Sequence, residues 1–388
     1  MKMELFARTD KIKIPDENSF SELDVEEEDL KGEEEVIMEP FDPTQIDVDI
    51  ANVNLGSLID QLINDEIDLQ PDFQRASDIW DPVQKSRLIE SILLGLPLPS
   101  FYFSENPVSK KLAIIDGLQR LCALRDFILN KESPLVLRNL QFLKDFEGKT
   151  YADLARPEIR RINALKITIN TLRKNTPDKV KFVIFQRVNT AGVPLEAQEM
   201  RHALNQGEAA RFIKELADLD SFKRATNYCV RSKRMQDRDF VNRFIAFYIG
   251  YEEYNGELDM FLNDKMRVLN KMKAGERDEL KEAFEKSMDC CYRIFGEDAF
   301  RRRKRPSDRR KPISKSVFDT VSVNIAWLTD AERMKLEERA GVFKQKMMEL
   351  FNDNKFDFSI STGTAQKYNV EQRFNRVKQI IGETLSYD

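Results

Sequence analysis

Histidine is nearly absent from the sequence, since His202 is the single copy among 388 residues. An HNH-type nuclease surrounds its metal ion with several histidines, and zinc sites and general bases also rely on this side chain. The composition therefore excludes an HNH centre within this chain. Any nuclease activity has to use other residues or another chain.

Cysteine and long apolar runs are also scarce. The four cysteines form no C-x-x-C pair and show no regular spacing, so the sequence predicts neither a zinc site nor a disulfide framework, and we expect reduced thiols. The first fifteen residues lack the apolar core of a signal peptide, and no stretch approaches the roughly 18 apolar residues of a membrane span. We therefore expect a cytoplasmic protein with no membrane contact.

Negative charge is concentrated at the N-terminus. Residues 1–50 carry 17 acidic and 5 basic side chains, a local charge of −12, whereas the whole chain carries −5, so the remainder is net positive by 7. Acidic side chains this dense repel one another and bury little. We expect residues 1–46 to form an acidic, largely disordered arm and the folded body to start near Asp47.

Residues 47–206 mix helix and strand patterns. Leu58 and Leu62 recur at helical spacing, and a second helix has Asp81 as N-cap, Pro82 in its first turn and Gly95 after its end. Strands are predicted over 99–103, 112–115 and 166–169, the first two as a hairpin or as sheet neighbours, and further helices from about 118 to 128, over 178–188 and over 195–206.

From residue 207 to 388 the strand signals nearly vanish. Amphipathic segments indicate an α-helical domain, among them 240–248, 266–272, 279–295, 317–328 and 333–351. The fold class is therefore predicted as α+β, with a small mixed sheet in the N-terminal domain followed by the helical domain.

The strand-to-helix junction at Asp116-Gly117 is the best candidate for an anion site. First-turn amides of a helix point outward unpaired, and a glycine lets the chain turn tightly near an anion. Arg120 can then clamp phosphate oxygens, Gln119 can bind a phosphate or a water, and Asp116 can hold a divalent ion or orient the arginine. Alternatively, Asp116 caps the helix, Gly117 only turns the chain and Arg120 is solvated.

Two other segments carry polar residues beside predicted turns. Gln74 and Arg75 follow an extended segment, where Arg75 can supply a second side of a phosphate clamp, and Trp80 either stacks on a base or, as is commoner, packs under the next helix. Further on, Arg187 and Asn189 flank a sharp turn and can reach a ligand. The alternative for this second segment, which continues to Glu199 and Arg201, is an internal Arg-Glu pair that fixes two helices.

A run of eight basic side chains among eleven residues interrupts the helical domain at 301–311. It predicts salt-sensitive DNA binding without base readout, since no aromatic residue is interleaved; the alternative is a solvated loop. We also predict that the acidic arm shields this run, so that truncating residues 1–42 raises DNA affinity at low salt. The run comprises Arg301, Arg302, Arg303, Lys304, Arg305, Arg309, Arg310 and Lys311.

Four motifs follow one another in a fixed order between residues 74 and 199. They read Q-R at 74–75, I-E-S-I-L-L-G-L-P-L-P at 89–99, D-G-L-Q-R at 116–120, and F-Q-R-V-N-T-A-G-V-P-L-E-A-Q-E at 185–199. Each motif is weak alone, but together they resemble the family of the GmrSD restriction enzyme N-terminal domain, whose fold is related to ParB and sulfiredoxin.

The resemblance implies binding of a nucleoside triphosphate with Mg²⁺, often with hydrolysis, and restriction of modified or invading DNA. It implies a phosphate site of Asp116, Gly117, Gln119 and Arg120, joined by Gln74 and Arg75, with Asp116 as the metal ligand; Arg187 and Asn189 would also contact the nucleotide.

Two departures from the family pattern matter. The usual motif is D-G-Q-Q-R, and Leu118 replaces its first glutamine, which bears on hydrolysis more than on binding. The HNH domain of the two-module enzymes is missing, so a separate nuclease chain is the expected partner, and homo-oligomerisation stays open. The leading hypothesis is a triphosphate-hydrolysing DNA-recognition subunit; the alternatives are a non-hydrolysing nucleotide switch and a DNA nickase acting alone.

Overall fold

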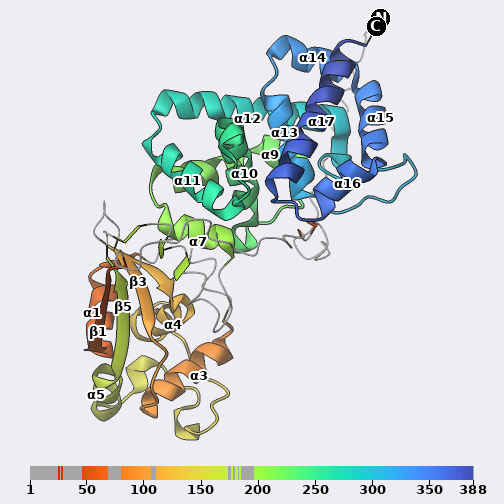
Figure 1. Ribbon diagram of the computed structural model, residues 1–388. Helices are drawn as coiled ribbons and strands as arrows, with labels where there is room; N and C mark the ends of the chain where they lie inside the picture. The colour runs from red at the N-terminus through yellow and green to blue at the C-terminus, as the bar shows by residue number, and fades with distance from the viewer. Residues whose placement is uncertain are drawn as a thin grey trace, which may run out of the picture.

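The chain forms a sheet-containing part and a helical part, as shown by a computed structural model (Figure 1). The structure describes residues 25, 26, 28, 46–68, 80–105, 111–173, 176–177, 180–181, 183–184 and 196–387. In Figure 1 the strands gather at one end of the molecule and helices fill the other, with α7 (Ala197–Leu204) between the two parts.

Within the described ranges, five strands form one mixed sheet in the order β1-β5-β3-β4-β2. β1 runs antiparallel to β5, β5 parallel to β3, β3 antiparallel to β4 and β4 parallel to β2. The inner strands β3 and β4 carry apolar residues that are buried on the sheet, such as Phe101, Phe103 and Ile114. The strands span Val48–Asn54 (β1), Ile67–Asp68 (β2), Phe101–Glu105 (β3), Leu112–Asp116 (β4) and Lys166–Leu172 (β5).

Helices pack around this sheet and close a core. α3 packs against α4 and α5, and α1 packs against α5. Asp81 accepts a hydrogen bond from the Gln84 amide, and the Gln84 side chain accepts one from the Asp81 amide, which fixes the start of α3 with Pro82 in its first turn. The helices are α1 (Leu55–Ile63), α3 (Pro82–Leu93), α4 (Leu118–Leu124), which continues as a π-helical segment over Arg125–Leu129, and α5 (Arg156–Ala164).

The second part of the chain consists of helices and the connections between them, with one isolated bridge between Arg301 and Ile313 among its described residues. Its long helices pack around α10 and α13, which contact each other and are buried along most of their length. The helices are α8 (Glu208–Asp218), α9 (Asp220–Ala225), α10 (Gln236–Gly250), α11 (Leu258–Lys271), α12 (Ala274–Phe295), α13 (Lys315–Ala326), α14 (Asp330–Glu338), α15 (Ala340–Phe351), α16 (Asn354–Ser361) and α17 (Lys367–Leu385), and a short 3-10 turn, η6 (Lys233–Met235), precedes α10.

The buried apolar residues fall into two groups. One lies between the sheet and its helices, from Leu55 to Ala203, and the other lies among the helices from Ala209 onward. In the second group the aromatic rings make repeated edge-to-face contacts, for example Phe240 with Phe318 at 4.9 Å between centroids. No helix in the described part of the chain combines the length and the apolar character needed to cross a membrane.

The α+β prediction is confirmed, together with the order of the main elements that the structure describes. The helix predicted over 178–188 lies mostly outside the described residues. Two details of the prediction are corrected. β1 was not predicted, because only Val48, Ile50 and Val53 among its residues are large and apolar, and backbone pairing with β5 holds this edge strand instead. The segment 333–351 forms two helices, since the backbone at Arg339 (φ −100°, ψ 22°) leaves helical geometry.

Three residues of the acidic arm have defined contacts with the helical part. Val25 pairs in parallel with Ile313, the Glu26 amide donates to the Ile313 carbonyl at 2.7 Å, and Glu28 is buried, with a side chain 10% exposed. The sequence predicted that the acidic arm buries little and did not predict these three contacts.

Candidate functional site

The candidate phosphate site lies where β4 ends and α4 begins. Gly117 stands between them with φ +104°, in the left-handed region that side-chain-bearing residues rarely adopt. A Cβ atom at this position would also lie 2.5 Å from Cδ1 of Phe101 in β3. Both the turn and the close packing of β3 therefore require glycine here.

Arg120 turns back onto β3 instead of extending into solvent. Its guanidinium donates to the Asp116 carboxylate at 2.8 Å, to the Ser100 carbonyl at 3.2 Å and to the Pro99 carbonyl, and it lies 4.4 Å from the centroid of the Phe101 ring. The side chain is only 9% exposed. Of the roles considered for these residues, the geometry fits an Asp116 that orients the arginine, and it rules out a solvated Arg120.

Burial sets the electrostatics of this pair. Loss of hydration raises the pKa of Asp116 and lowers the pKa of Arg120, while their mutual attraction opposes both shifts. The ion pair therefore sits in a partly dehydrated setting, where a nearby phosphate would interact more strongly with the helix amides than it would in bulk water.

Gln119 and Trp80 bring the start of α3 to the same junction. The Trp80 amide donates to Oε1 of Gln119 at 3.3 Å, and the Trp80 ring is half-buried against the sheet core. This is the packing role that was expected to be commoner for a tryptophan ahead of a helix.

Four predicted nucleotide contacts lie outside the described residues: Gln74, Arg75, Arg187 and Asn189. One described end of the segment 69–79 nevertheless reaches the junction, because Trp80 bonds Gln119. At the other end, Asp68 pairs with Ala113 near the start of β4. The structure thus brings together Asp116, Gly117, Gln119 and Arg120 and says nothing of the other four.

Among the described residues, no group of three or more His, Cys, Asp or Glu side chains is placed to hold a metal ion. Mg²⁺ that arrives with a triphosphate needs only one or two protein carboxylates, because phosphate oxygens and waters fill its other positions. Asp116 fits that more limited part with a carboxylate about a quarter exposed, although Arg120 already bonds it.

Glu199 and Arg201 fix α7 to the helical part of the chain. Glu199 accepts from Arg234 at 2.9 Å, whereas Arg201 donates to Asp239 at 2.6 Å and to Asp259 at 2.5 Å. The internal ion-pair interpretation is therefore the one the geometry supports. The sequence predicted an Arg-Glu pair within this segment, whereas the observed partners Arg234, Asp239 and Asp259 come from η6, α10 and α11.

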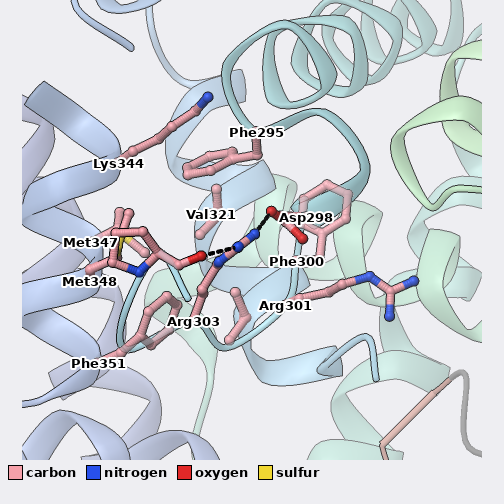
Figure 2. Close-up of a pocket in the computed structure, with 12 residues that line it drawn as sticks. Phe295, Asp298, Phe300, Arg301, Arg303, Val321, Lys344, Met347, Met348 and Phe351 are labelled. Carbon is pink, nitrogen blue, oxygen red and sulfur yellow. Dashed lines mark hydrogen bonds and ion pairs between the residues drawn. The ribbon is translucent and has the colours of Figure 1, made fainter. Parts of the chain in front are cut away.

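The basic run at 301–311 is partly anchored to the protein. Arg303 donates to the Asp298 carboxylate and to the Pro306 carbonyl at the edge of an apolar pocket of about 230 Å³ that Phe295, Met347 and Phe351 line (Figure 2). Arg301 is buried, Arg302 pairs with Glu26, Lys304 with Asp357, and Arg310 with Glu297 and Asp298.

Four cations of this run are exposed, and three of them are outside any ion pair. Arg305, Arg309 and Lys311 form no side-chain ion pair with the described residues, whereas the exposed Arg310 pairs with Glu297 and Asp298. Of the eight predicted DNA contacts, these three can therefore meet a polyanion without first breaking an ion pair.

Glu90 is a structural residue that sequence reasoning did not single out. It is 3% exposed, and its carboxylate accepts from the backbone amides of Gln141, Phe142 and Leu143 at 3.0, 2.6 and 2.9 Å. Burial raises its pKa, but these three donors outweigh that effect and lower it. The sequence feature that could have identified Glu90 is its position as a lone acidic residue within the apolar face of α3.

Comparison with known protein families gives a match over this part of the chain. Residues 58–206 match the model of the GmrSD restriction endonuclease, N-terminal domain. This segment is a GmrSD N-terminal domain. The match runs from α1 to the residue pair after α7, and thus includes the Asp116–Arg120 junction and the Glu90 anchor.

The GmrSD domain implies that the protein is a component of a restriction-like system. Searches among curated proteins and among solved structures gave no match. The helical part from residue 207 lies outside the GmrSD match.

Proposed function

We propose that the chain binds a nucleoside triphosphate at the Asp116–Arg120 junction, hydrolyses it, and serves in the cytoplasm as the DNA-recognition subunit of a restriction system. Cleavage of DNA is then the task of a separate nuclease chain. The observation that carries the proposal is the strand, left-handed glycine and helix start that lie within a GmrSD domain.

The proposed binding mode follows from the donors at this junction. The amides of Leu118, Gln119 and Arg120 lie in the first helical turn, where α-helical geometry provides no intrahelical acceptor. Anions bind at such helix starts because these amides and the helix dipole favour negative charge. The Gln119 side chain, half-buried at the surface of the turn, adds a polar contact.

The residues of this chain would promote hydrolysis by positioning and charge. Mg²⁺, which arrives with the triphosphate, supplies charge neutralisation at the transferred phosphoryl group. The Asp116 carboxylate would be a protein ligand to that Mg²⁺, and Arg120 keeps Asp116 oriented through their 2.8 Å contact. By the family resemblance, Arg75, which lies outside the described residues, would supply a guanidinium for the phosphates.

A non-hydrolysing switch is the second candidate, and one observation favours it. Leu118 is buried in the sheet core, so the position that carries the first glutamine of the usual D-G-Q-Q-R motif presents no polar group to a ligand. Under this alternative the nucleotide binds tightly and releases no phosphate.

The two candidates are separated by measuring nucleotide binding and phosphate release with and without DNA. We expect the wild type to release phosphate from a triphosphate in the presence of Mg²⁺, and Asp116→Asn and Gln119→Ala each to reduce the rate by a factor on the order of 10². Arg138→Ala, which changes an exposed arginine of the same domain, is the matched control and should behave as the wild type.

The outcomes decide between the models. Binding without turnover supports the switch, and the absence of any nucleotide binding by the folded wild type contradicts both. Plasmid nicking by the chain alone in Mg²⁺ or Mn²⁺ would contradict the need for a separate nuclease.

A further inference from the structure

A large polar cavity lies between α7, the turn η6, α10, α11 and the start of α13. Its volume is about 610 Å³, within the usual range of ligand sites. Among the described residues, its lining includes no aromatic side chain but four acidic and six basic ones, which give a net charge of +2. The six cations are Arg201, Arg231, Lys233, Arg234, Arg243 and Lys315.

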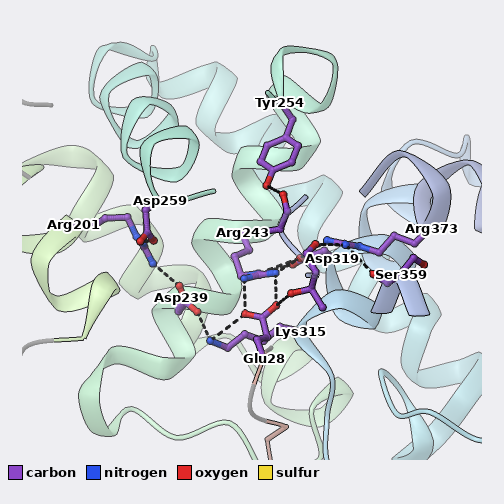
Figure 3. A network of polar contacts seen from close by, with 12 residues as sticks. Glu28, Arg201, Asp239, Arg243, Tyr254, Asp259, Lys315, Asp319, Ser359 and Arg373 are labelled. Atoms are coloured by element: carbon purple, nitrogen blue, oxygen red, sulfur yellow. Dashed lines mark hydrogen bonds and ion pairs between the residues drawn. The ribbon is translucent and has the colours of Figure 1, made fainter. Parts of the chain in front are cut away.

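A carboxylate from the acidic arm occupies part of this cavity. Glu28 accepts two hydrogen bonds from Arg243, each of 2.9 Å, and lies 3.8 Å from Nζ of Lys315 and 3.4 Å from the Thr364 hydroxyl (Figure 3). The two parallel bonds to a guanidinium are the geometry in which arginine also recognises a phosphate group.

The cations that hold Glu28 have other, permanent partners. Arg243 bonds the fully buried Asp319 at 2.6 Å through its other edge, and Lys315 bonds Asp239 at 2.8 Å. These bonds keep both cations in place when the arm is absent. Without Glu28 the charge of the cavity lining rises from +2 to +3, and the terminal nitrogens of Arg243 lose one carboxylate.

One wall of the cavity also holds an unfilled hydrogen-bond donor. Oε1 of Gln198 accepts from Arg201 at 2.8 Å and from Asn242 at 3.2 Å, which fixes the orientation of the amide. Its Nε2 atom is buried and has no partner among the described residues. Gln198 thus adds an unsatisfied buried donor to a residue of the cavity wall.

The cavity lies next to the basic run at 301–311. Arg301 donates to the sulfur of Cys229, which lines the cavity, and Arg302 pairs with Glu26. Glu26 and Glu28 stand two positions apart, about 7 Å in an extended chain. The arm therefore presents two neighbouring negative charges, one to the basic run and one to the cavity. Successive phosphates of a nucleic-acid strand would present charges in the same way.

We propose that the Arg243–Lys315 cavity is a site for a backbone phosphate of a nucleic-acid strand, and that Glu28 fills it in the absence of that strand. The absence of aromatic side chains gives a mononucleotide base nothing to stack on, and the adjoining basic run gives a strand a path onward. This inference rests on the DNA-binding part of the proposed function and names the surface that would perform it.

The test compares the binding of a short labelled oligo-dT strand at low salt by full-length variants. Glu28→Gln should raise the affinity by ~5-fold or more, because the strand no longer competes with a carboxylate. Glu338→Gln removes the same charge from an exposed position on α14 and is the matched control. If both variants gain the same affinity, the change in net charge alone explains the effect, and the proposal is overturned.

A second substitution tests the cavity from the cationic side. Lys233→Ala, at an exposed lining residue, should cancel most of the gain in the Glu28→Gln background and lower the salt dependence of binding by about one phosphate contact. If the double variant binds the oligonucleotide as tightly as the Glu28→Gln single variant does, the proposal is overturned. A response of ATP binding, instead of oligonucleotide binding, to Glu28→Gln would overturn the assignment to nucleic acid.

The wild-type chain provides a check that does not depend on the folding of a variant. Oligonucleotide should speed hydrogen exchange at residues 25–28 and protect residues 231–234, and no change at either place overturns the proposal. Failure of every variant to bind DNA contradicts the DNA part of the proposed function as well, whereas binding that ignores Glu28 and Lys233 contradicts this inference alone.

Discussion

Single residues of the GmrSD motifs are explained by packing at least as directly as by a ligand. Gly117 and Phe101 touch so closely that no side chain fits at residue 117. Arg120 donates its hydrogen bonds to Asp116 and to the carbonyls of Pro99 and Ser100. The first observed role of the motif is thus to build the turn at the end of β4, and anion binding at the helix amides is the additional role that we propose.

Replacing Gly117 tests how much the close packing contributes. Gly148→Ala is the matched control, because Gly148 also has a positive φ (+80°) but no atom within 4 Å of an added Cβ. The control should lose about 1–2 kcal/mol of unfolding free energy through backbone strain alone. Gly117→Ala should lose about 1–3 kcal/mol more, through the contact with Phe101.

The measurement is denaturant unfolding of both variants. Equal losses at the two positions would show that contact with Phe101 adds nothing to the strain.

Glu90 offers a second residue-scale prediction. Glu90→Gln replaces one carboxylate oxygen with an amide donor that faces backbone N–H groups, so we expect a loss of about 2–3 kcal/mol in unfolding free energy. Glu132→Gln, at an exposed loop position, should be neutral.

The lowered pKa of Glu90 fixes the pH dependence of that loss. Stabilisation by a carboxylate with a lowered pKa is complete above its ordinary value of 4.5 and disappears as the pH falls through the folded-state value. The difference between wild type and Glu90→Gln should therefore shrink below pH 4.5. A difference that stays constant into acid would contradict the role assigned to the carboxylate.

At the scale of elements, the sequence predicted what local signals specify. The α3 helix was located from Asp81, Pro82 and Gly95, and the junction at residue 116 from a strand followed by Asp-Gly. β1 was missed because its stability comes from pairing with β5, more than a hundred residues away. The partners of Arg201 were missed for the same reason, since Asp239 and Asp259 come from α10 and α11.

The arrangement of the candidate site was predictable only in part. Motif order placed Asp116, Gly117, Gln119 and Arg120 together, but the inward direction of Arg120 depends on the carbonyls that precede β3. The Glu28 site was not predictable, because it joins residues 28, 243 and 315 through tertiary packing alone.

The cysteines on α12 give an element-scale prediction. Burial raises the pKa of Cys290 to about 12, with Glu337 adding to the shift, and raises the pKa of Cys291 well above its ordinary value. Cys122 and Cys229 are also buried. We expect all four thiols to resist a thiol reagent in the native protein and to react on unfolding. Rapid labelling of Cys290 or Cys291 under native conditions would contradict this packing of α12.

At the scale of the whole molecule, two cores are joined through the polar contacts of α7. Arg201 and Glu199 tie the last helix of the GmrSD domain to α10, α11 and η6, and the cavity that holds Glu28 lies at the same junction. A ligand that entered this cavity would touch α7, and α7 packs against β4, the strand that leads into the Asp116 turn. The two proposed sites are thus linked by a chain of direct contacts.

Triphosphate binding at the Asp116–Arg120 junction is tested most directly by hydrogen exchange of the full-length protein with and without a triphosphate and Mg²⁺. We predict slowed exchange in the peptide that spans Ile115 to Leu121, because the ligand would bind the first-turn amides of α4. Tight binding of the nucleotide with unchanged exchange in this peptide, and protection elsewhere, would contradict it.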